Sequence, residues 1–173
     1  MNTRLVGSEM CIRDRERKHS WDARDPATVY YTPETLADGT PTTALTVILR
    51  TKGCHWWWSS GCTFCGYFND TRDDVTSQDL HTQWEKSLAK FEDFESMGMV
   101  KVYTSGSLLE DREIPLDFQE RVLRDCYEMG KELVVESRTE QLTMEKLEWA
   151  TKINPKFSVC LLYTSPSPRD VCS

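Results

Sequence analysis

The sequence has no apolar run long enough to cross a membrane. A transmembrane helix needs about 20 consecutive apolar residues, and a charged side chain interrupts every stretch of that length here. The N-terminal segment MNTRLVGSEMCIRDR also lacks a continuous apolar core of about 7–15 residues, which a secretory signal requires. We therefore expect a protein of the cytoplasm that does not associate with membranes.

The sequence also lacks an excess of positive charge. It carries 21 basic and 28 acidic residues among 173, a net charge of −7. This balance excludes a protein that holds nucleic acid by overall positive charge alone. Hydrophobic residues make up 39% and charged residues 28%, which is typical of a globular domain and not of a disordered chain.

The two termini are related to each other at the level of DNA. A DNA sequence that encodes CLLYTSPSPRD (160–170) can be chosen with permitted codons. The complementary strand of that DNA, read in a shifted frame, encodes LVGSEMCIRD, which is residues 5–14. This arrangement is similar to a sequencing-library adapter that flanks a gene in both orientations. We therefore expect residues 1–15 and 160–173 to be adapter artefacts, exclude them from fold reasoning, and interpret the chain as an N-terminal fragment.

Seven cysteines in a chain without a secretory signal indicate a reducing compartment, where metal or redox chemistry is more common than a disulfide framework. If the termini are artefacts, the cysteines that remain are Cys54, Cys62, Cys65 and Cys126.

Strand-like and helix-like segments alternate through the middle of the chain, after a polar, proline-containing lead-in at residues 16–41 that we expect to be extended. Thr76 and Asp79 predict a helix-starting capping box, and Gly98 predicts a left-handed helix end. The expected strands are 42–51, 99–104, 132–138 and a stretch from 156, and the expected helices are 76–97, 115–130 and 143–153. This alternation predicts an α/β fold with a parallel sheet, whose core is residues 42–159.

Cys54, Cys62 and Cys65 form the motif that carries the clearest chemistry. They follow the first predicted strand directly, and loops at the carboxyl ends of parallel strands build active sites. Three thiolates can hold a four-iron cluster and leave one iron open to an external ligand. A structural zinc site needs a fourth ligand, for which the sequence offers His55, His81 or Cys126. Buried cysteines without a metal are the third interpretation.

At these residues the sequence resembles the radical S-adenosylmethionine (SAM) superfamily. Phe64 occupies the aromatic position before the last cysteine, although seven residues, instead of the usual three, separate the first two cysteines. The longer loop is similar to that of the elongator-catalytic-subunit-like branch. The more specific resemblance is to the radical SAM family of archaeosine biosynthesis. It runs through LRTKGCHWWWSSGCTFCGYFNDT (49–71), KVYTSGSLLEDREIP (101–115) and ELVVESRTEQL (132–142).

The resemblance implies a fold and a set of roles. The fold is a partial (β/α)6 radical SAM barrel, of which this chain holds the truncated N-terminal half. The three cysteines are the implied ligands of a 4Fe-4S cluster. The implied SAM contacts are Phe64, Ser105, Gly106, Ser107, Glu136 and Arg138. The alternative for Ser105, Gly106 and Ser107 is a plain strand-ending turn. The alternative for Glu136 and Arg138 is a structural salt bridge. We expect the charged residues 110–113 to be a solvated loop.

The resemblance also implies a function, which is the cleavage of a carbon–nitrogen bond of a lysine-modified 7-deazaguanine in archaeal tRNA to give archaeosine. The implied partners are the tRNA, the synthase subunit that attaches the lysine, and an electron donor. The chain alone is expected to be inactive. The alternatives are another radical SAM modification of tRNA, similar to that of elongator, and a non-catalytic zinc-binding module.

Overall fold

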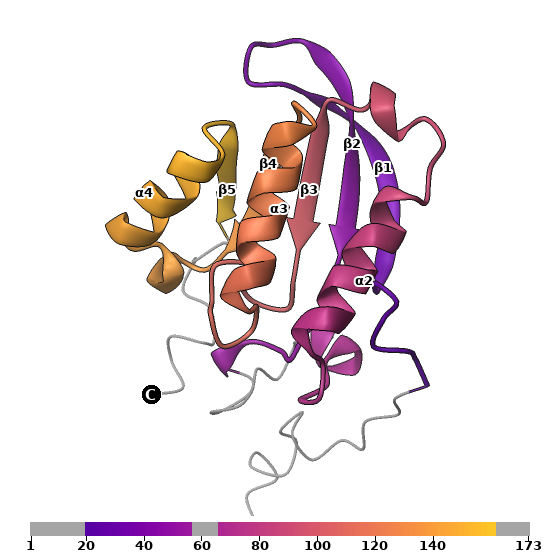
Figure 1. Cartoon of the computed structure of the whole chain (residues 1–173), viewed down its shortest axis with the longest axis vertical. Helices are drawn as coiled ribbons and strands as arrows, with labels where there is room; N and C mark the ends of the chain where they lie inside the picture. Colours follow the sequence, from indigo (N-terminus) through magenta and orange to yellow (C-terminus); the bar gives the residue numbers. More distant parts are fainter. Residues whose placement is uncertain (1–19, 57–65, 162–173) are drawn as a thin grey trace, which may run out of the picture.

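The computed structural model describes residues 20–56 and 66–161, and it contains one five-stranded sheet covered by three α-helices (Figure 1). The strands are β1 (Thr28–Thr35), β2 (Pro41–Ile48), β3 (Met99–Tyr103), β4 (Glu132–Ser137) and β5 (Phe157–Leu161). The helices are α2 (Ser77–Leu88), α3 (Leu116–Glu128) and α4 (Met144–Ile153), with short 3-10 turns η2 (Tyr67–Asp70), η3 (Phe94–Ser96) and η4 (Thr139–Gln141). No helix among these residues is long and apolar enough to span a membrane.

The sheet has its strands in chain order, β1-β2-β3-β4-β5. Strand β1 runs antiparallel to β2, and β2 through β5 are parallel. All three helices lie over the same face of the sheet (Figure 1). Each crossover therefore adds the next strand on the same side, as in a barrel and in contrast to a doubly wound sheet, where the order reverses. The predicted α/β fold is confirmed, and the four strands that were predicted to be parallel are parallel, whereas β1 adds an antiparallel strand at one edge. The partial barrel stays a prediction.

Strand β1 lies inside the segment predicted only to be an extended lead-in. Its composition hides it, because Tyr30 and Tyr31 are exposed and Val29 is its one buried residue. Pro33 fits this strand because β1 is at the edge of the sheet, where a residue without an N–H group can be placed without losing a hydrogen bond to a neighbouring strand. At the opposite edge, β5 continues through Cys160 and Leu161, which pair with Glu136 and Ser137.

Helix α2 begins as predicted and ends earlier than predicted. Thr76 accepts a hydrogen bond from the Asp79 N–H, and the Asp79 carboxylate accepts one from the Thr76 N–H, which completes the capping box. The helix ends at Leu88 and not at residue 97. Gly98 has an ordinary negative φ, and a Cβ built there would lie 2.5 Å from Thr42 Oγ1. Glycine is needed at this position for a close approach to β2, not for a left-handed turn.

The core lies between the helices and the sheet. Trp84 of α2 is fully buried, and its indole N–H donates to Asp125 of α3 at 2.8 Å, which joins the two helices. Cys126 of α3 belongs to the same apolar cluster and has no exposed surface. This packing fixes the strands relative to one another, and it thereby fixes the loops that follow their carboxyl ends.

Candidate functional site

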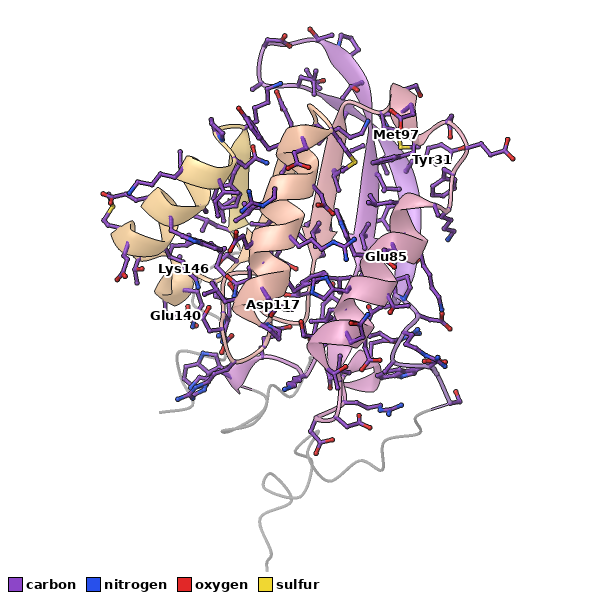
Figure 2. The ribbon with its side chains drawn as sticks, in the orientation of Figure 1. Tyr31, Glu85, Met97, Asp117, Glu140 and Lys146 are labelled. Atoms are coloured by element: carbon purple, nitrogen blue, oxygen red, sulfur yellow. The ribbon has the colours of Figure 1, made fainter. Side chains whose placement is uncertain are left out.

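The carboxyl ends of β2, β3 and β4 carry the predicted site residues. Cys54 lies six residues after β2, residues 104–107 follow β3 directly, and Arg138 follows β4. Because these strands are parallel neighbours, their ends meet at one edge of the sheet. In Figure 2 the labelled residues Asp117 and Glu140 lie near this edge, toward which the strand arrows point.

Cys54 packs directly against Gly106. A Cβ built on Gly106 would lie 2.4 Å from the Cys54 Cβ and 3.2 Å from its Cα, closer than real side chains allow. Cys54 itself is 7% exposed. Gly53, just before it, has a φ of +90°, a left-handed conformation that favours glycine. The structure therefore brings together the first predicted cluster ligand and the middle of the predicted SAM-binding turn.

Glu113 is a buried carboxylate that joins two of these loops. Its Oε1 accepts hydrogen bonds from the Thr51 hydroxyl at 2.7 Å and the Ser105 N–H at 2.9 Å, and its Oε2 accepts one from the Ser107 N–H at 3.0 Å. Burial raises the pKa of Glu113 to about 7, because desolvation outweighs the three donors, and the neighbouring charge of Glu110 adds to the rise.

Glu110 forms a buried ion pair with Arg138. Arg138 Nη2 lies 2.7 Å from Glu110 Oε2, and both side chains are 4% exposed. Arg138 Nη1 lies 3.2 Å from Glu140 Oε1, within ion-pair distance but outside hydrogen-bond geometry. The Arg138 Nε has no hydrogen-bond partner among residues 20–56 and 66–161. A buried guanidinium with an unused donor is suited to receive an anionic group of a ligand.

The expectation of a solvated loop at residues 110–113 is wrong for its two glutamates. Glu110 is 3% exposed and Glu113 is 1% exposed, whereas Asp111 and Arg112 between them are exposed. The backbone turns here, since the N–H groups of Glu113 and Ile114 both donate to the Glu110 carbonyl. The spacing of three between the glutamates, which places both on one side of a helical turn, was the available signal.

The remaining predicted residues lie at the same edge. The Ser107 and Ser137 hydroxyls are 2.5 Å apart and both residues are fully buried, so this hydrogen bond joins the ends of β3 and β4. The Gly106 N–H donates to Thr104 Oγ1 at 3.3 Å. The Glu136 carbonyl accepts from the Leu108 N–H at 3.1 Å. Whether Ser105, Gly106, Ser107, Glu136 and Arg138 contact SAM stays a prediction.

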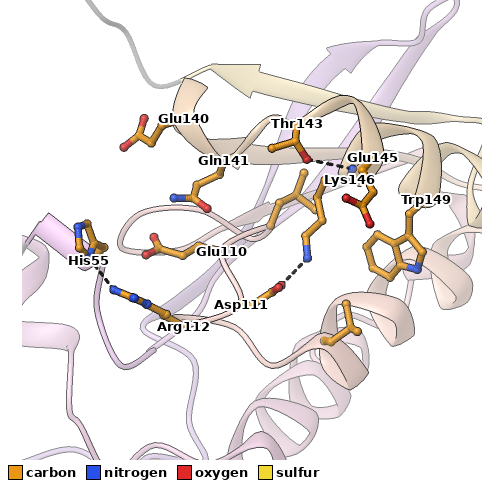
Figure 3. Close-up of a pocket in the computed structure, with 12 residues that line it drawn as sticks. His55, Glu110, Asp111, Arg112, Glu140, Gln141, Thr143, Glu145, Lys146 and Trp149 are labelled. Carbon is orange, nitrogen blue, oxygen red and sulfur yellow. Dashed lines mark hydrogen bonds and ion pairs between the residues drawn. The ribbon is translucent and has the colours of Figure 1, made fainter.

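A pocket of about 750 Å³ opens beside these loops, between the turn at residues 109–116 and the start of α4 (Figure 3). On one side His55 Nδ1 lies 3.3 Å from the Arg112 guanidinium. On the other side Lys146 forms an ion pair with Asp111 and lies over the ring of Trp149. The pocket therefore reaches from the residue after Cys54 to helix α4.

Two of the three predicted cluster ligands, Cys62 and Cys65, and the predicted aromatic residue Phe64, lie outside the described residues. Within residues 20–56 and 66–161, no three His, Cys, Asp or Glu side chains are grouped as metal ligands. Cys126 is a poor fourth zinc ligand, because it is buried in the core and burial raises the pKa of its thiol to about 12. His81 of α2 is engaged by Asp117 and Arg121.

Comparisons with known proteins find similar proteins in three archaea. It is 34% identical over 140 residues to an archaeosine synthase subunit beta of Methanosarcina acetivorans, and 31% identical over 130 residues to one of Thermococcus kodakarensis. It is also 31% identical over 145 residues to an uncharacterised protein of Methanocaldococcus jannaschii. No family model and no solved structure matches the chain.

These matches cover 73–79% of this chain, and the chain spans about 40% of the length of the curated relatives it matches. The sequence predicts a relation to archaeosine biosynthesis, and the names of two relatives support it. Over 73–79% of its length, the chain is thus similar to archaeosine synthase beta subunits of two archaea.

Proposed function

We propose that this chain is part of a radical SAM enzyme of archaeosine biosynthesis. Cys54, Cys62 and Cys65 would hold a 4Fe-4S cluster, which would supply the electron for the reductive cleavage of SAM. The observation that carries the proposal is the position of Cys54, which lies at the carboxyl edge of a parallel sheet and against the turn after β3.

The described residues fit such a group. Cys54 provides a thiol in a loop that glycine allows to approach the neighbouring strand end closely. Arg138 provides a buried cation whose Nε lacks a hydrogen-bond partner within the described ranges, and SAM carries a carboxylate. The role of the chain's own residues is to orient the ligands and to exclude water from this edge of the sheet.

We propose a substrate from the relatives' names and the sequence resemblance together. It is a tRNA whose 7-deazaguanine carries a lysine adduct, and cleavage of the lysine carbon–nitrogen bond leaves the formamidine of archaeosine. The proposed partners are the lysine-transferring synthase subunit and an electron donor, in the cytoplasm. This chain has a net charge of −7 and offers no overall positive surface to the tRNA backbone. We therefore propose that the partner subunit, or the part of the relatives that this chain does not match, supplies the basic surface.

Anaerobic reconstitution of the chain with iron and sulfide tests the cofactor. We expect about four irons per chain and an electron paramagnetic resonance signal, after reduction, that changes when SAM is added. About one zinc per chain without iron, or a cluster signal that SAM does not alter, would contradict the proposal.

Two variants test the ligand assignment. Cys54→Ala should abolish cluster binding, because it removes one of three ligands. Cys126→Ala is the matched control, since that thiol is buried in the core and its loss should leave the iron content unchanged. Full iron content in Cys54→Ala would refute the role of this cysteine.

A further inference from the structure

A chain of hydrogen bonds connects Glu113 to the peptide that precedes Cys54. The Gly53 N–H donates to Thr51 Oγ1 at 3.1 Å, and the Thr51 hydroxyl donates to Glu113 Oε1 at 2.7 Å. Thr51 and Glu113 are each no more than 1% exposed. One hydroxyl therefore separates the Glu113 carboxylate from the left-handed glycine at which the backbone turns toward Cys54.

The same carboxylate also holds the turn after β3. Its two oxygens accept from the N–H groups of Ser105 and Ser107, on either side of Gly106. Gly106 is the residue against which Cys54 packs, and its built Cβ would lie 2.6 Å from Glu113 Oε2. Glu113 is thus hydrogen-bonded both to Thr51, in the segment that leads to Cys54, and to the turn against which Cys54 packs.

Only a side chain with two hydrogen-bond acceptor atoms satisfies the donors on both sides of Glu113. A carboxylate has two acceptor oxygens, whereas an amide has one acceptor and one donor. In Glu113→Gln, the amide NH₂ would face either the Ser107 N–H or the pair formed by the Ser105 N–H and the Thr51 hydroxyl. The change is nearly isosteric, so it removes hydrogen bonds without creating a cavity.

We propose that Glu113 is a positioning residue. It holds residues 51–56, which we call the Cys54 loop, against the turn formed by residues 104–107, and Thr51 transmits its effect to Cys54. The proposal rests on the proposed cluster-binding role of Cys54. It assigns a task to an acid within a run of four charged residues, EDRE (110–113), that lies outside the cysteine motif.

The thiol reactivity of the metal-free chain tests this proposal independently of any cluster. Cys54 is buried, so its alkylation at pH 8, followed peptide by peptide with mass spectrometry, reports opening of the loop. We expect Glu113→Gln to speed alkylation of Cys54 by about tenfold or more, because hydrogen bonds to a charged group are lost. Cys126 in the core is the internal reference, and Glu128→Gln, at an exposed position of α3, is the matched control.

Thr51 variants separate positioning from general stability and serve if Glu113→Gln does not fold. Thr51→Val removes the hydroxyl at nearly constant shape and should speed the alkylation of Cys54. Thr51→Ser keeps the hydroxyl, so Cys54 should be alkylated as slowly as in the wild-type chain. A Cys54 rate that is unchanged in Thr51→Val, or equally fast in Thr51→Ser, would overturn the proposal.

Reconstituted chain provides the second readout. In Glu113→Gln and Thr51→Val, we expect the cluster signal to change its line shape and its response to SAM, and in Thr51→Ser to match the wild-type chain. If the wild-type chain binds no cluster but the alkylation pattern holds, the proposed function fails and the positioning role stands. If the wild-type cluster forms and the variants match it in both readouts, the positioning role is wrong.

Discussion

Gly106→Ala adds one methyl group at the contact between the two site loops. The built Cβ lies 2.4 Å from the Cys54 Cβ, 2.6 Å from Glu113 Oε2 and 3.2 Å from the Cys54 Cα. Favourable contacts between carbon atoms occur at about 3.5–4.0 Å. A rotation of the Cys54 side chain cannot relieve the overlap, because the Cβ and the backbone Cα of Cys54 are both involved. Either the segment that carries Cys54 or the turn that carries Gly106 must therefore move by about 1 Å.

The expected cost follows from the behaviour of tightly packed sites. Overpacking by one methyl group in a packed site costs about 1–3 kcal/mol. For a domain of this size, each kcal/mol shifts Tm by about 2–4 °C, so we expect a decrease of roughly 2–12 °C. Because Cys54 is a proposed cluster ligand, we also expect the iron content after reconstitution to fall well below that of the wild-type chain.

Differential scanning calorimetry of the metal-free chain and iron analysis of the reconstituted chain measure the two effects. Gly66→Ala is the matched control for calorimetry, since a Cβ at Gly66 meets no atom of residues 20–56 or 66–161 within 4 Å and its φ is −83°. An unchanged Tm together with unchanged iron content in Gly106→Ala would refute the packing of Cys54 on Gly106.

Two further predictions concern the buried charges. Arg138→Met leaves the Glu110 carboxylate buried without its partner and should lower the free energy of unfolding in urea by about 3–5 kcal/mol; adding Glu110→Gln should recover much of that loss, and a double variant as unstable as the single one would contradict it. For Glu113, burial raises the pKa from 4.5 to about 7, so the folded state holds a proton that the unfolded state releases between these pH values. The free energy of unfolding should therefore fall as pH rises through this window, by at most about 1.4 kcal/mol per pH unit, and Glu113→Gln should lack this component; equal slopes for both chains would refute it.

The sequence predicted the parallel part of the fold because each of its elements carries a local signal. The capping box of Thr76 and Asp79 marked the start of α2, and the alternating segment at residues 99–104 marked β3. Strand β1 was not recognised because an edge strand packs one face only weakly, and exposed tyrosines and Pro33 resemble a loop. The end of α2 was misplaced because Gly98 serves a contact with Thr42, which is 56 residues away.

The candidate site was predicted in part, for a related reason. Cys54 and the turn after β3 were found because their position at strand ends follows from the order of elements. Glu113 was missed because its main side-chain partner, Thr51, is 62 residues away. A carboxylate in a charged run appears solvated until the fold supplies buried donors, and no local pattern shows which strand ends supply them.

The buried charges at the site are distributed unequally, and this difference has a consequence for function. Glu110 faces the guanidinium of Arg138, a permanent cation, and is neutralised within the site. The hydrogen-bond donors of Glu113 are neutral groups, and the charge of Glu110 repels its negative charge. The negative charge of Glu113 is therefore the one that a cationic ligand at this edge of the sheet would stabilise. If SAM binds near Gly106 as proposed, its cationic sulfonium and amino groups would favour the ionised form of Glu113, and Glu113 in turn would favour SAM binding, because such coupling is reciprocal.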